Sequence, residues 1–133
     1  MGQMITLTAD YGHRLSAYRA APSGTPKGGL VVVQEIFGVN HHIQGLCDRF
    51  AADGYVALAP AIFDRVEPGL NLGYTADDIE RGRSIRGKVD IADMVRDVRA
   101  AVEDSRPKGR AWAWWAIAWA ARSRGWRARA STA

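Results

Sequence analysis

One acidic residue is a candidate for chemistry because it follows directly on a fully apolar segment. Leu30–Val33 is aliphatic and largely β-branched, which is typical of a strand buried on both faces. Gln34 and Glu35 come next, and open α/β sheets gather ligands and catalytic groups at the carboxyl ends of their parallel strands. Glu35 is therefore predicted to be a site residue. The alternative is a carboxylate that caps the next helix or faces solvent.

The elements around this segment predict an α/β fold. The two-residue alternation of residues 5–9 and 15–18 predicts an N-terminal hairpin. Residues 42–52 have apolar side chains at helical spacing and precede a second buried strand at residues 55–59, so that a parallel βαβ unit is expected. A helix is predicted to begin at Thr75, and another to span Ile91–Val102. Its apolar face is expected to include Ile91, Met94, Val95, Val98 and Val102, and its charged residues, Asp97 among them, are expected to face solvent.

The residues around Glu35 resemble the dienelactone hydrolase family (carboxymethylenebutenolidases). The most specific block is Gln-Glu-Ile-Phe-Gly at residues 34–38, and shorter matching blocks lie at residues 42–43, 47–49, 52–57 and 59–60. The resemblance runs from about Ile5 to Arg110. It implies an α/β-hydrolase that opens enol-lactones with a Cys-Asp-His triad, and a small-molecule lactone or ester as its partner. No cofactor or metal is expected.

The resemblance also implies roles for individual residues. Glu35 would hold the thiol partner before substrate arrives, and the Ile36 N–H would be one oxyanion donor. The backbone N–H groups of such a strand-to-helix turn are suited to that task in their own right. Arg81 and Arg83 are candidates for binding the substrate carboxylate, and the alternative for both is a solvated helix face.

The sequence departs from the family where the chemistry should be completed. The family's nucleophile, acid and histidine lie downstream of residue 110, in that order, and no counterparts are found here. Cys47 lies on the apolar face of a predicted helix and is expected to be a buried structural cysteine. His41 and His42 flank that helix's start, where Asn40 is a candidate N-cap, and are expected to be surface residues. No triad-dependent turnover is expected.

Composition changes sharply at residue 110. Of the 18 Lys and Arg residues, four follow residue 110, whereas all 14 acids precede it, so residues 1–110 are electroneutral. Residues 111–133 therefore carry the whole net charge of +4, together with all five tryptophans and nine alanines. The single cysteine excludes an intramolecular disulfide, and no signal peptide or membrane-spanning stretch is apparent, so a cytoplasmic protein is expected.

Three interpretations compete for residues 111–133. Trp112, Trp115, Trp119 and Trp126 share one helical face, which with the arginines could bind anionic membranes. The same residues could instead bind single-stranded nucleic acid. In the third interpretation, the segment is the family's next strand and nucleophile turn, translated in the wrong reading frame.

The genetic code favours the third interpretation. Tryptophan has only the codon TGG and alanine codons begin with GC, so reading from each third base restricts what the neighbouring frame encodes. From Ala111, that frame encodes an aliphatic residue, Gly, an aliphatic residue, Val, Gly, one of Tyr, His, Asn or Asp, one of Cys, Ser or Arg, an aliphatic residue, and Gly. This string is a buried strand that runs into G-x-[C/S]-x-G, the nucleophile elbow of α/β-hydrolases. No nucleic-acid or membrane partner is then expected.

The sequence thus predicts a truncated α/β-hydrolase fold. Residues 1–110 are expected to be the N-terminal half of a dienelactone-hydrolase-like domain, and residues 111–133 an out-of-frame Trp/Arg/Ala-rich tail. Without the next strand, Leu30–Val33 is expected to expose an apolar edge that promotes aggregation.

Overall fold

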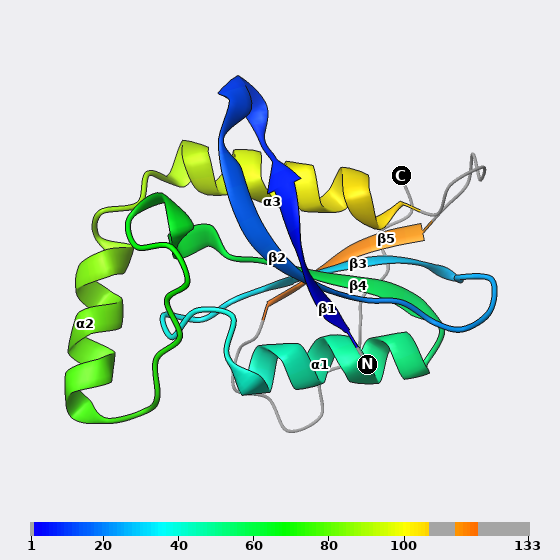
Figure 1. Cartoon of the computed structure of the whole chain (residues 1–133), viewed down its shortest axis with the longest axis horizontal. Coiled ribbons are helices and arrows are strands. Elements are labelled where there is room, and N and C mark those ends of the chain that lie inside the picture. Colours follow the sequence, from blue (N-terminus) through cyan, green and yellow to red (C-terminus); the bar gives the residue numbers. More distant parts are fainter. Residues whose placement is uncertain (1, 107–113, 120–133) are drawn as a thin grey trace.

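The structure, a computed structural model, describes residues 2–106 and 114–119. These residues form a mixed β-sheet with helices packed on it (Figure 1). The sheet has the strand order β1-β2-β4-β3-β5, formed by β1 (Gln3–Thr8), β2 (Arg14–Ala20), β3 (Gly28–Val33), β4 (Tyr55–Pro60) and β5 (Trp114–Trp119). β1 and β2 form an antiparallel hairpin, β2 is antiparallel to β4, and β3 is parallel to both β4 and β5. The predicted hairpin and parallel βαβ unit are confirmed.

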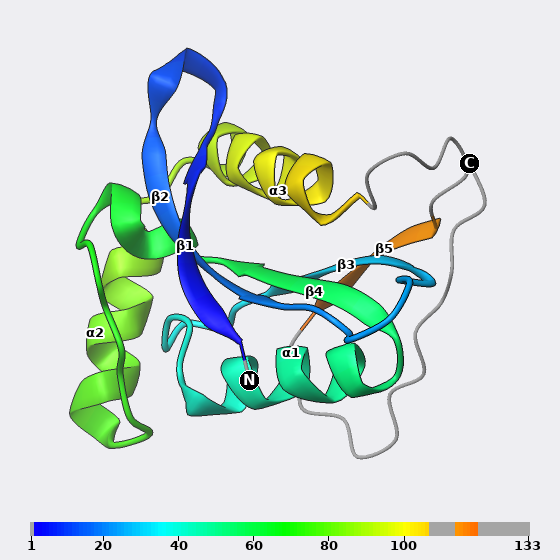
Figure 2. The same cartoon turned by 45° about the vertical axis from the view of Figure 1, so that its right-hand side comes forward.

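Two helices cover opposite faces of this sheet. α1 (His41–Ala52) lies on one face and α3 (Ile91–Ser105) on the other, as the two views in Figures 1 and 2 show. Successive side chains of β3 point to opposite faces, so Val32 packs in the α1-side cluster whereas Val31 and Val33 pack in the α3-side cluster. β3 is therefore buried on both faces, as its aliphatic run predicted.

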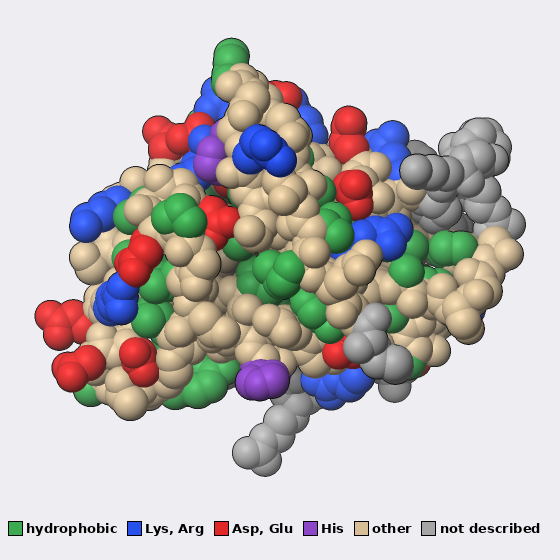
Figure 3. Space-filling view, viewed as in Figure 1, with side chains coloured by type: hydrophobic (Ala, Val, Ile, Leu, Met, Phe, Trp, Pro, Cys, Tyr) green, Lys and Arg blue, Asp and Glu red, His purple; other side chains and the backbone are tan. Residues whose placement is uncertain are grey.

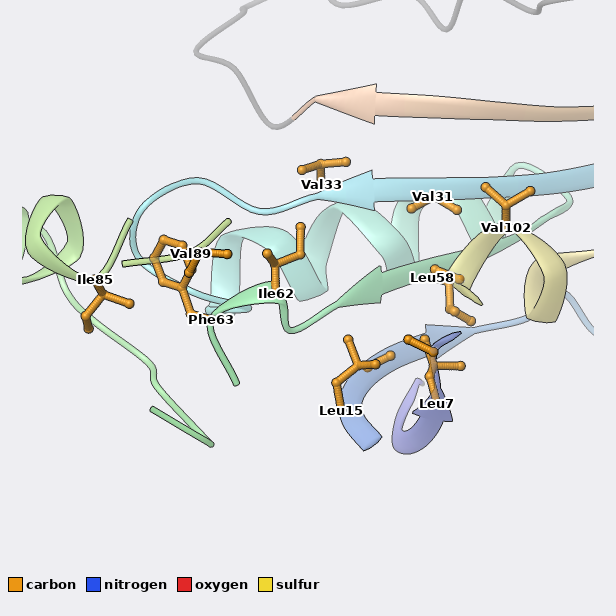
Figure 4. Close-up of a cluster of buried hydrophobic side chains, with 13 residues drawn as sticks. Leu7, Leu15, Val31, Val33, Leu58, Ile62, Phe63, Ile85, Val89 and Val102 are labelled. Carbon is orange, nitrogen blue, oxygen red and sulfur yellow. The ribbon is translucent and has the colours of Figure 1, made fainter. Parts of the chain in front are cut away.

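The α3-side cluster extends beyond the sheet toward the third helix, α2 (Ala76–Arg86). Leu7 and Leu15 close one end of this cluster, and Ile85 and Val89 lie at its other end (Figure 4). Thr75 is the N-cap of α2, which confirms the predicted helix start, and it forms a capping box with Asp78. The cluster anchors α2 beside the ends of β3 and β4.

β3 has a strand on each side, so the predicted unpaired edge is wrong. It pairs with β4 along one edge and with β5 along the other, in a register that runs from Gly28 opposite Trp114 to Val33 opposite Trp119. Tryptophan and isoleucine favour strands, which explains how this segment can occupy the position of the missing neighbour. The membrane-binding interpretation assumed a helix with Trp115 and Trp119 on one face, and this is wrong for residues 114–119, which form a strand. Trp112 and Trp126 lie outside the described residues.

α3 also corrects the prediction for its two faces. Asp97 was expected in solvent but is fully buried, and Arg65 donates to its two carboxylate oxygens, from Nε at 3.0 Å and from Nη2 at 2.8 Å. Arg65 ends the 3-10 helix η2 (Ile62–Arg65), which follows β4, so the pattern of α3 alone could not reveal this partner. Ile91 and Val95 were expected in the core but are 67% and 52% exposed.

Charges of both signs are mixed on the face shown in Figure 3. Opposite charges also pair across the described residues: Asp93 accepts a hydrogen bond from Arg96 Nη1 at 2.7 Å, and Arg19 Nε lies 3.5 Å from Asp104 Oδ2. This agrees with the equal numbers of acids and bases before residue 111. In the described part of the chain, no helix is long and apolar enough to cross a membrane.

The buried ion pair generates a stability prediction. Asp97→Asn removes the fully buried carboxylate that holds the Arg65 guanidinium at 2.8 Å and leaves it only the half-buried Asp93 at 3.6 Å, so the free energy of unfolding should fall by about 3–5 kcal/mol. The matched control is Asp104→Asn, which removes an exposed partner of Arg19 and should cost about 1 kcal/mol or less. Urea unfolding of both variants measures the difference, and equal losses would contradict a dominant role for the buried pair.

Candidate functional site

The turn that follows β3 is closed by bridges at the carboxyl edge of the sheet. One bridge joins Glu35 to Gly38, and another joins Gly38 to Asn71, which lies between η2 and α2. The Leu72 N–H donates to the Phe37 carbonyl oxygen at 2.9 Å. Two segments that are distant in sequence therefore hold the turn in one conformation.

Gly38 makes this conformation possible for two reasons. Its φ angle is +84°, in the left-handed region that side chains other than glycine rarely adopt. A Cβ atom at this position would also collide with the Leu70 carbonyl oxygen. A glycine is therefore needed here both for the backbone angle and for the close approach of the second segment.

α2 packs against the same turn through Gly82. This glycine is buried, and a Cβ atom on it would collide with the Ile36 carbonyl oxygen. Glycine inside a helix costs roughly 0.5–1 kcal/mol relative to alanine. Its presence is explained here by backbone-to-backbone contact between α2 and the turn.

Asn40 joins the turn to the start of α1. Its Oδ1 accepts from the Ile43 N–H at 3.2 Å, so the predicted N-cap is confirmed. Its Nδ2 donates to the Tyr74 hydroxyl at 3.0 Å. The Tyr74 ring packs edge to face on the Phe37 ring, with 4.6 Å between the ring centroids. Because Asn40 is the cap, Glu35 does not cap α1, and that alternative for Glu35 is wrong.

Two unpaired groups stand next to each other in this turn. Glu35 is half-buried at the end of β3 as predicted, and its carboxylate has no hydrogen-bond or ion-pair partner among the residues that the structure describes. Within the same described part of the chain, the Ile36 N–H also has no acceptor. A carboxylate can accept a proton or a hydrogen bond from a reacting group, and a backbone N–H can stabilise an oxyanion, so the two groups together are suited to acyl transfer.

Arg81 and Arg83 lie on either side of Gly82 on α2. Both are exposed, and Arg81 forms an ion pair with Glu67, from the segment after η2. The structure therefore brings the backbone of α2, rather than either guanidinium, into contact with the turn. A role for these arginines in binding substrate stays a prediction.

The remaining candidate side chains lie away from the turn. Cys47 is fully buried in α1, and burial, followed by the nearby Asp48 charge, raises the pKa of its thiol to about 12. His41 and His42 are exposed at the start of α1, as expected. Within residues 2–106 and 114–119, no group of His, Cys, Asp and Glu is arranged to hold a metal ion.

A cavity in the described part of the chain is separate from these groups. It has a volume of about 240 Å³ and lies between the hairpin, η2 and the start of α3, where it is lined by His13, Arg65, Val66, Lys88, Val89, Asp90 and Asp93. Two of its acids already have partners, because Asp90 caps α3 and Asp93 pairs with Arg96. The candidate site therefore rests on the turn after β3 and not on this cavity.

Gln34 and Gly82 were missed by the reasoning from sequence. Gln34 is a buried polar residue placed directly after an apolar strand, and that position was the signal that could have identified it. Gly82 was visible as a glycine within a predicted helix. In both cases the partner atoms come from another segment of the chain.

Known proteins of one enzyme family resemble this chain in sequence. The model of the dienelactone hydrolase family matches residues 15–110. A protein of Synechocystis sp. that is provisionally named carboxymethylenebutenolidase is 41% identical over 90 residues, which are 67% of this chain and 37% of that protein. Another with the same provisional name, from Azospirillum brasilense, is 49% identical over 69 residues, which are 51% of this chain and 30% of that protein.

A solved structure agrees with the sequence relatives. The crystal structure of a provisionally named dienelactone hydrolase from Klebsiella pneumoniae has a TM-score of 0.64 and 28% identity, over 88% of this chain and 50% of that chain. With the observed strand order, this confirms an α/β-hydrolase type of fold. The chain spans about half the length of that structure and 37% and 30% of the two sequence relatives.

The burial of Cys47 predicts an unreactive thiol. At pH 8 the native chain should react with Ellman's reagent only as fast as it unfolds, because the thiol is inaccessible and its pKa is raised to about 12. In concentrated urea the reaction should be rapid and consume one equivalent of reagent, and Cys47→Ala is the blank. Rapid stoichiometric labelling of the native chain would show that Cys47 is an accessible nucleophile.

Proposed function

Because the chain belongs to the dienelactone hydrolase family, we propose that residues 1–110 are the N-terminal half of a hydrolase domain for lactones or esters. The observation that carries the proposal is the pair of unpartnered groups at the end of β3, the Glu35 carboxylate and the Ile36 N–H. They lie at the carboxyl edge of a parallel strand, where this type of sheet supports catalysis.

The two groups have defined tasks in the proposed reaction. A cysteine of the second half attacks the carbonyl carbon as a thiolate, and Glu35 orients that thiol before substrate binds. The carbonyl oxygen becomes an oxyanion, which accepts hydrogen bonds from the Ile36 N–H and from the N–H that follows the nucleophile. The ring or ester oxygen then leaves, and water hydrolyses the acyl-enzyme. No cofactor enters these steps.

We propose further that the 133-residue chain does not itself carry out this turnover. β5 consists of Trp, Ala and Ile, so it supplies no nucleophile, and the thiol of Cys47 is buried in α1. The register supports the same conclusion. In the neighbouring frame, the cysteine codon would begin at the third base of the Ile117 codon, and Ile117 lies opposite Val31. That position is inside the strand and short of the level of Glu35.

Three observations support a displaced reading frame after residue 110. The family match ends at residue 110, where the charge balance also changes. A strand at residues 114–119 occupies the place beside β3 where the fold requires one. The neighbouring frame would encode a strand that leads into a nucleophile elbow there. A membrane- or nucleic-acid-binding tail is the alternative, and a cytoplasmic location is proposed from the single free cysteine.

The first test is hydrolysis by the purified chain. With p-nitrophenyl acetate or an enol-lactone, we expect the 133-residue chain and its Glu35→Gln variant to give the same rate as buffer with a matched inert protein. The reason is that β5 offers no nucleophile and that, among the described residues, none lies beside the oxyanion donor. Hydrolysis above that background that disappears in Glu35→Gln would overturn the proposed inactivity.

The second test is the nucleotide sequence itself. Resequencing codons 105 to 135 and the downstream region should reveal, in the frame read from the third codon base, the elbow followed by an Asp and a His. A chain expressed in that frame should hydrolyse the same esters and lose activity when its elbow cysteine is changed to alanine. A downstream region without a related open frame would defeat the frameshift interpretation.

A further inference from the structure

Gln34 occupies an unusual position between the apolar strand β3 and the candidate site. It is buried, with 9% of its surface exposed, and its side-chain amide makes two hydrogen bonds. Nε2 donates to the Glu35 carbonyl oxygen at 3.0 Å, and Oε1 accepts from the Ile62 N–H at 3.0 Å. Burying an amide is unfavourable unless it is hydrogen-bonded, so these two bonds explain why a polar side chain is tolerated here.

The first of these bonds acts on the peptide that contains the proposed oxyanion donor. The Glu35 carbonyl and the Ile36 N–H belong to the same peptide group, which is planar and trans, so the C=O and N–H bonds point in opposite directions. Fixing the carbonyl oxygen therefore fixes the direction of the N–H. The Gly38 N–H approaches the same oxygen at 3.4 Å, but it belongs to the turn itself and moves with it.

The second bond connects this peptide to a neighbouring strand. Ile62 begins η2 directly after β4, and its side chain packs in the α3-side cluster with Val33 (Figure 4). The Gln34 amide thus links the peptide after β3 to the backbone after β4. A rotation of the Glu35–Ile36 peptide would break this link and would turn a carbonyl oxygen, which repels an oxyanion, toward the site.

We propose that Gln34 is a positioning residue that aims the Ile36 N–H at the reacting oxygen. The inference rests on the proposed function for the meaning of that N–H, but the geometry that it predicts is independent of any hydrolysis. Gly82 complements Gln34, because α2 confines the next peptide through contact with the Ile36 carbonyl oxygen. The turn is consequently held from the β4 side by hydrogen bonds and from the α2 side by packing.

The test measures the orientation of one N–H bond in the 133-residue chain. In ¹⁵N-labelled, weakly aligned protein, the residual dipolar coupling of Ile36 should fit the alignment tensor defined by β3, β4 and α1. In Gln34→Met, which has a similar shape but cannot make either bond, the Ile36 coupling should shrink toward zero as the peptide samples other orientations. The couplings of the strands should not change.

The matched control is Gln44→Met. Gln44 also donates from Nε2 to a main-chain oxygen, that of Val39 at 3.1 Å, but it lies in α1, and within the described part of the chain its side chain makes no hydrogen bond to the Glu35–Ile36 peptide. If Gln34→Met is too unstable to measure, it can be combined with Gly45→Ala, because Gly45 lies in α1 with open space around it and alanine favours a helix. We expect the Ile36 coupling to be retained in Gln44→Met.

Two outcomes would overturn the inference. One is an Ile36 residual dipolar coupling that stays unchanged in Gln34→Met. The other is an Ile36 coupling close to zero in the wild-type chain itself, which would mean that this N–H is not fixed even with Gln34 present. Failure of the proposed function is distinguishable. In that case the coupling responds to Gln34→Met as expected, but the chain expressed in the restored frame, with its elbow cysteine, does not hydrolyse esters.

Discussion

The complete burial of β3 is the constraint on which the rest of the structure depends. The strand has a helical layer on each face and a hydrogen-bonded strand on each edge, so none of its own side chains can reach solvent or substrate. The first polar side chains after it, Gln34 and Glu35, lie where that burial ends. An active-site group next to β3 must therefore be placed by the turn that follows the strand, and the accuracy of its placement depends on what holds the turn.

The sequence predicted those features that depend on local pattern. The buried strand, α1 with its Asn40 cap, the start of α2 and the location of Glu35 all follow from hydrophobic periodicity, capping chemistry or strand-end position. Contacts between distant segments were not predictable in the same way. The buried Asp97, for example, is stabilised by Arg65 from η2, and the periodicity of α3 contains no information about that partner. Gln34 was passed over for the same reason, because its importance depends on Ile62.

β5 shows how far a sheet position can be filled by an unexpected sequence. The expectation of an open edge assumed that residues rich in Trp and Ala could not act as the next strand. β3 offers a complete ladder of backbone donors and acceptors, however, and a six-residue segment of high β-propensity satisfies them irrespective of its side-chain identities. Under the proposed frameshift, backbone pairing would be retained and catalysis would be lost, because a nucleophile elbow needs one particular residue at one particular place.

The groups that fix the turn after β3 all come from one part of the chain. The groups that fix the turn, namely Gln34 with Ile62, Gly38 with Leu70, Asn40 with Tyr74 and Gly82 with Ile36, all belong to residues 34–82. The nucleophile that would use the turn belongs to a different part of the family's fold. An oxyanion donor is effective because it is oriented before charge develops, so that no reorganisation is required during the reaction. In this chain the contacts that orient the Glu35–Ile36 peptide all lie within residues 34–82, so on the proposed function the N-terminal half would position the oxyanion donor independently of the nucleophile.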